Sequence, residues 1–162
     1  MLSISSITLN SNTGSISSSN GEVIIHPKMN ISEFTRKFKL ELPLPTISGA
    51  QNIPFEGKFY SETIRGEFRF FEGQIQSIGW NWPHDQYPTP EESESEVEVF
   101  KAIFINKIGI NISNSIYDLP WGHVVAEVEQ ISMTPVIGIH YKTTGIFFRI
   151  RSLFYALLRD TR

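Results

Sequence analysis

The side chains best suited to acid–base chemistry or metal ligation near neutral pH are four histidines, His26, His84, His123 and His140. No two of them form an i, i+4 pair or a His-x-His motif, and no H-E-x-x-H sequence is present. The chain has no cysteine, which excludes thiol nucleophiles, disulfides and cysteine-ligated metal sites. We therefore expect no metal site and no cofactor.

Nucleophilic and nucleotide-dependent chemistry also lacks its usual motifs. The chain contains no G-x-S-x-G or S-x-x-K sequence for a serine nucleophile, and no G-x-G-x-x-G or Walker A loop for phosphate binding. A glycosidase-like pair among Glu56, Glu62, Glu67 and Glu72 stays open, because folding can bring distant carboxylates together. We expect a non-enzymatic protein and assign no catalytic residue.

A segment rich in aromatic residues and proline runs from Trp80 to Pro88. Trp80 and Trp82 fall on the same face of a predicted strand, because side chains alternate along a strand. If that face is the core, both indoles are packing residues. If it is open, they form with Tyr87 a contact surface of the kind that dominates many binding energies.

An acidic run follows this segment. It contains no Lys or Arg and six acids, namely Asp85, Glu91, Glu92, Glu94, Glu96 and Glu98. One interpretation is a solvated helix face. The other is a negative surface that accelerates encounter with a basic partner. The same charges disfavour binding to nucleic acid.

The end of the chain has the opposite charge. Five basic residues stand against Asp160 alone, namely Lys142, Arg149, Arg151, Arg159 and Arg162. Apolar residues at helical spacing predict an amphipathic helix over 145–160. We expect this helix to dock on the sheet, and the alternative is contact with an anionic membrane.

The elements that must position these groups are mostly strands. The chain has 22 Ile and 12 Phe but only 4 Ala, which favours a sheet over a helical bundle. Glu72-Gly73 predicts a tight hairpin. Asn30 and Thr89 are each followed by Glu three residues later, which predicts a short helix ending near Phe38 and a main helix ending near Ile108.

The predicted fold is a single α+β domain over residues 1–162. A largely antiparallel sheet of six or seven strands carries the main helix on one face, with two smaller helices. We interpret residues 1–19 as a hairpin or meander, with a disordered tail as the alternative. The first twenty residues lack the basic and apolar regions of a secretory signal, and no apolar run is long enough for a membrane span, so we expect a cytoplasmic protein.

Scattered motifs between residues 5 and 142 carry a family resemblance. They include Thr13-Gly14, Pro27-x-Met29, the run from Phe70 to Ile75, and Trp121-Gly122-x-Val124. In these motifs the chain resembles a group of small, mostly uncharacterised bacterial proteins that are often encoded beside polymorphic toxins, in the manner of contact-dependent growth inhibition immunity proteins. None of the matching residues is a known catalytic or ligand-binding group, and the acidic run and the C-terminal helix depart from the pattern.

The acidic run and the resemblance together predict a bacterial immunity protein. It would neutralise a cognate toxin with a basic surface, such as a nuclease, through the six acids with Trp80, Trp82 and Tyr87. The alternative is a β-rich module that binds a small ligand or carbohydrate on the three aromatic rings. We expect neither nucleic acid nor membrane as a partner.

Overall fold

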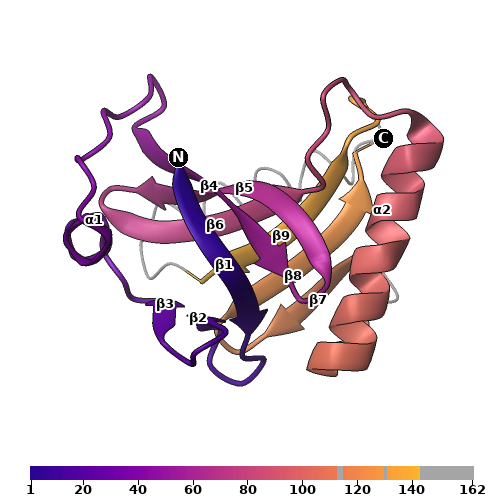
Figure 1. Cartoon of the computed structure of the whole chain (residues 1–162), viewed down its shortest axis with the longest axis horizontal. Coiled ribbons are helices and arrows are strands. Elements are labelled where there is room, and N and C mark those ends of the chain that lie inside the picture. Colours follow the sequence, from indigo (N-terminus) through magenta and orange to yellow (C-terminus); the bar gives the residue numbers. More distant parts are fainter. Residues whose placement is uncertain (113–114, 130, 143–162) are drawn as a thin grey trace, which may run out of the picture.

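The computed structural model describes residues 1–112, 115–129 and 131–142, whose nine strands form one curled sheet (Figure 1). Across the sheet the strands lie in the order β3-β2-β1-β4-β5-β6-β9-β8-β7. Their bounds are β1 (Leu2–Leu9), β2 (Ile16–Ser18), β3 (Val23–Ile25), β4 (Ala50–Phe59), β5 (Glu62–Phe71), β6 (Gln74–Asn81), β7 (Ile116–Leu119), β8 (Gly122–Val128) and β9 (Pro135–Tyr141).

The sheet is mixed, which corrects the expectation of an antiparallel one. β1 runs parallel to β4, while every other neighbouring pair is antiparallel. A parallel neighbour requires a long connection, and β2, β3 and α1 (Ile31–Phe38) supply it here. The α+β class therefore holds in outline, with nine strands instead of six or seven.

The two expected helix starts are confirmed. The Asn30 side chain accepts a hydrogen bond from the Glu33 amide at the start of α1. Thr89 and Glu92 form a complete capping box at the start of α2 (Pro90–Ile103). One turn of π-helix, η1 (Phe104–Ile108), continues α2, and Gly109 ends it in the left-handed conformation.

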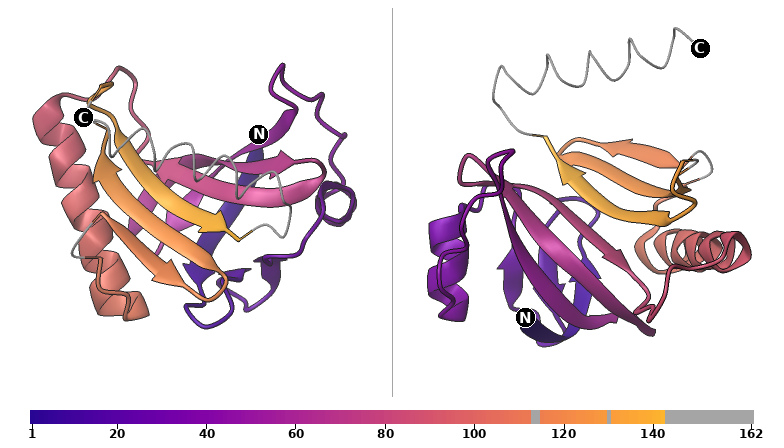
Figure 2. Two further views of the ribbon diagram at one scale, coloured as in Figure 1. Left: turned by 180° about the vertical axis from the view of Figure 1, so that it is seen from behind. Right: turned by 90° about the horizontal axis from the view of Figure 1, so that it is seen from above.

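The core lies between the curled sheet and the two helices, which pack at opposite ends of the molecule (Figure 2). At one end Phe34 of α1 lies 4.8 Å from Phe68 of β5, measured between ring centroids. At the other end Phe100 of α2 packs near Phe59 and Trp80. All five rings are at least nine-tenths buried, so the aromatic residues hold both helices to the same face of the sheet.

The N-terminal strands complete the enclosure of the core. The β1–β2 loop reaches the end of β9, where the buried Tyr141 hydroxyl donates to the Gly14 carbonyl oxygen at 2.9 Å. Nearby, the Trp121 indole N–H donates to the Ser11 carbonyl oxygen at 2.7 Å. Residues 2–18 are thus two strands with long-range contacts, rather than a disordered opening.

Three further outcomes concern single elements. The Glu72-Gly73 hairpin is present between β5 and β6. β7 is a strand that the sequence did not predict. The helix predicted at 145–160 lies outside the described residues, and within the described part no helix is long and apolar enough to cross a membrane.

We predict that Gly14→Ala lowers the free energy of unfolding by roughly 2 to 4 kcal/mol, because an added Cβ strains the backbone and overpacks the core. Gly14 has φ 72°, and its Cβ would lie 2.4 Å from the Trp121 ring. Urea denaturation measures the change. Gly21→Ala is the matched control, since Gly21 has φ 82° but nothing within 4 Å. Equal losses in the two variants would contradict the packing role of Gly14.

Candidate functional site

The segment from Trp82 to Pro88 connects β6 to α2 and carries most of the residues that the sequence singled out. Three features hold it in place. The Trp82 backbone N–H donates to a buried carboxylate of α2, and the Trp82 indole N–H donates to Glu62 of β5. The segment ends at Thr89, which forms the capping box of α2.

Glu96 is the buried carboxylate, with no exposed surface. It accepts a hydrogen bond from the Trp82 backbone N–H and a second bond, of 2.7 Å, from Nε2 of His84. Burial of a carboxylate is costly unless donors surround it, and these two groups are the donors. Glu96 therefore ties the connecting segment to the helix, and it is not the surface residue that the sequence analysis expected.

Trp80 of β6 and Trp82, which directly follows this strand, are both packing residues, which resolves the alternatives left open by the sequence. Trp80 is fully buried, with its ring centroid 4.8 Å from that of Phe59. Trp82 is half-buried beside Phe100, and its indole N–H donates to Glu62 at 3.0 Å. The three-ring contact surface with Tyr87 is therefore not assembled.

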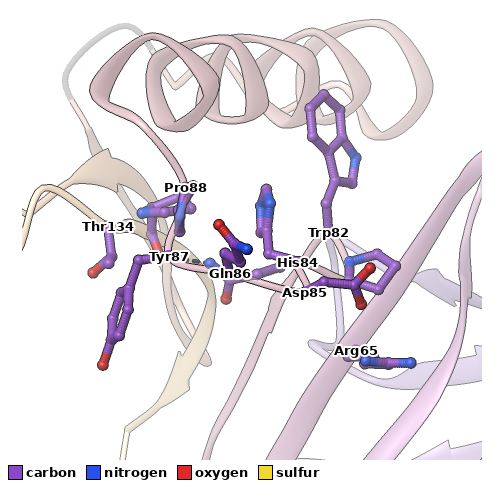
Figure 3. Close-up of a pocket in the computed structure, with 11 residues that line it drawn as sticks. Arg65, Trp82, His84, Asp85, Gln86, Tyr87, Pro88 and Thr134 are labelled. Carbon is purple, nitrogen blue, oxygen red and sulfur yellow. Dashed lines mark hydrogen bonds between the residues drawn. The ribbon is translucent and has the colours of Figure 1, made fainter.

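Tyr87 is the one aromatic side chain of this segment that faces solvent, at 90% exposure. In Figure 3, Trp82 and His84 point toward α2, whereas Tyr87 points away from it. Asp85 and Gln86 are exposed beside it. A pocket of about 420 Å³ opens here, lined by Arg65 and Asn81, by residues 82–88, and by Thr134 and Pro135.

The remaining acids lie on the exposed face of α2. Glu91, Glu94 and Glu98 recur at i, i+3 and i+7, so they form one stripe along the helix. Glu92 is also exposed, and its pKa is lowered by the hydrogen bonds from Thr89. Lys101 pairs with Glu98 at 3.0 Å at the far end of the stripe. We call Asp85, Tyr87, Glu91, Glu92, Glu94 and Glu98 the acidic face.

Two residues outside the predicted partner-binding set also position this face. Ser93 is buried and donates to the Met133 carbonyl oxygen at 2.8 Å, which ties α2 to the β8–β9 loop. Glu62 fixes the Trp82 indole. The signal for the buried side of α2 was present, because Ser93, Glu96, Val97 and Phe100 follow the i, i+3, i+4, i+7 spacing of a core stripe.

The sequence predicted no metal site and left a glycosidase-like carboxylate pair open. Among the residues that the structure describes, no cluster of three or more His, Asp or Glu side chains is close enough to hold a metal ion. Glu62 is engaged with Trp82, and Glu67 lies on the opposite face of β5. Comparison of the chain with protein-family models, with curated proteins and with solved structures finds no match.

We predict that Glu96→Ala lowers the free energy of unfolding by about 3 kcal/mol, because it leaves the Trp82 amide and His84 without their acceptor. Chemical denaturation measures this loss. Glu94→Ala changes the same side chain at an exposed position of the same helix and should cost within about 0.5 kcal/mol. A Glu96→Ala protein as stable as the Glu94→Ala protein would show that the buried carboxylate does not anchor the segment.

Proposed function

We propose that this protein is a non-enzymatic binding protein of the immunity type, which neutralises a basic toxin by covering it with the acidic face. The observation that carries the proposal is the fixed presentation of this face. α2 carries four exposed glutamates, and the segment that leads into it carries the exposed Asp85 and Tyr87. There is no Lys or Arg between positions 85 and 98.

The face is preorganised by contacts beneath it. Glu96 holds the connecting segment to the buried side of α2, and Ser93 holds the helix to the β8–β9 loop. A surface that is already ordered loses little conformational entropy when a partner binds. This arrangement supports the interpretation of the acidic run as a binding surface rather than as a solvated helix face.

Charge supports a basic partner. The whole chain has a net charge of −3, and four exposed glutamates concentrate negative charge along α2. Such a field steers an oppositely charged protein into contact and raises the association rate at low salt. A toxin whose active site binds phosphates presents the complementary positive surface, which supports a nuclease as the kind of target.

The pocket beside Tyr87 supports a second candidate, a small-ligand binding module. Its volume of about 420 Å³ lies in the range of small-molecule sites. Tyr87 and Asp85 are the side chains available for stacking and hydrogen bonding, since the tryptophans are packed against the core. The two candidates differ in the residues they require, because the immunity function depends on the α2 stripe and the ligand module on the pocket.

We predict that Glu91→Lys with Glu94→Lys lowers the association rate with the neighbouring gene's toxin product at least about tenfold at low salt, through loss of electrostatic steering. Surface plasmon resonance of the purified pair at low and moderate salt measures the rate. The matched control is Glu41→Lys with Glu72→Lys, which makes the same charge change at exposed positions outside the acidic face. Absence of a complex, or equal rates for the two double variants, would refute the proposal.

A further inference from the structure

The face of the sheet opposite the core carries a row of polar side chains that crosses six strands. Strand register places them side by side in the order Asn52, Arg69, Ser77, His140, His123 and Asp118. Directly paired residues on one face of a sheet have Cβ atoms about 5 Å apart. The row is therefore a continuous strip of hydrogen-bonding groups.

Arg69 is the second residue of this strip and has no anionic partner among the described residues. Its side chain is half-buried, and its Nε is shielded from solvent without a hydrogen-bond acceptor. The neighbouring Asn52 Oδ1 is buried and unpartnered in the same way. Every other Lys or Arg in the described part of the chain is exposed, apart from Lys101, which pairs with Glu98. A half-buried cation without an acceptor is costly, so this position favours an anion supplied from outside.

The next two side chains add hydrogen-bonding capacity. Ser77 is paired with both Arg69 and His140 across β6. The rings of His140 and His123 stack at 4.8 Å with an angle of 11°. Burial lowers the pKa of His140, and together with the charges of His123 and Arg69 it brings this pKa to about 4. Burial also lowers the pKa of His123. The negative charge of Asp118 opposes this shift, and the positive charge of Lys142 adds to it.

Two paired glycines, which we call the shelf, border the strip beside Glu67 of β5. Gly79 and Gly138 pair with each other one row along the same face. A Cβ built on Gly79 would meet nothing closer than the Ile137 carbonyl oxygen at 3.8 Å. Gly79 therefore leaves room for an added group beside the strip, whereas a Cβ on Gly138 would meet the Ile78 carbonyl oxygen at 2.2 Å.

We propose that this face is a binding site for a small molecule with an oxyanion group, carboxylate or phosphate, seated on Arg69 with Ser77 and His140 as further donors. The planar guanidinium matches either anion in a bidentate geometry. The site shares no residue with the acidic face, so it stands or fails independently of the immunity function.

The test is NMR titration of the full-length protein, with inorganic phosphate and acetate added in separate experiments. Either anion should shift the His140 imidazole resonances and raise the His140 pKa by about one unit or more, because a nearby negative charge stabilises the imidazolium. A response to phosphate alone assigns a phosphate ligand, and a response to acetate alone a carboxylate. His26 reports non-specific effects in the same spectrum, since it lies beside Glu33 of α1.

Arg69→Gln should abolish the response, and Arg65→Gln should retain it. Arg65 lies on the same strand and the same face but is exposed, so it is a matched control for charge. If the Arg69→Gln variant does not fold, Gly79→Leu tests the same site by filling the shelf, and it should weaken the response. A His140 pKa unaffected by both anions, or an equal response in the Arg69→Gln and Arg65→Gln proteins, would overturn the proposal.

Discussion

A carboxylate without solvent exposure has to be surrounded by donors. Glu96 imposes this requirement on α2 and on the segment that precedes it. Its two donors come from the segment that leaves β6, so the direction of that segment and the position of α2 are set together. The placement of α2 in turn lets Phe100 cover Phe59 and Trp80. These two hydrogen bonds thus help to fix the position of α2 over this end of the core.

The two faces of the sheet divide the chemistry of the molecule. The inner face is aromatic and aliphatic, and its side chains exclude water from the core. The outer face of the central strands is polar, with Arg69 and His140 held at fixed spacing by strand register. Because successive side chains alternate, each strand serves both faces at once. Stability and recognition therefore depend on different residues of the same strands.

The sequence predicted the features that depend on neighbouring residues. Both helix caps, the Glu72-Gly73 hairpin and the end of the main helix near Ile108 are local, and all are present. The parallel pairing of β1 with β4 was missed, because which distant strand lies beside β1 is decided by packing over the whole sheet. The edge strand β7 was missed because it has only four residues and these do not alternate between buried and exposed positions.

The candidate site was predicted in part. The acidic run and the segment after β6 adjoin in the sequence, but charge counting alone could not separate the buried Glu96 from the exposed Glu94. Helical spacing separates them, since Glu96 belongs to the same stripe as Val97 and Phe100. The cross-strand row around Arg69 could not be found from sequence, because its members are brought together only by the register of six strands.

The hydrogen bond from Tyr141 to Gly14 has a consequence for the order of folding. It joins residues 127 positions apart, and β1 itself pairs with a strand beyond α1. Closing such distant contacts costs chain entropy before any packing energy is returned, which slows folding. Local hairpins such as β5–β6 are expected to form early. The contact between the β1–β2 loop and β9 is expected to form late. Until then the open edge of β4 is the surface most exposed to pairing with another chain.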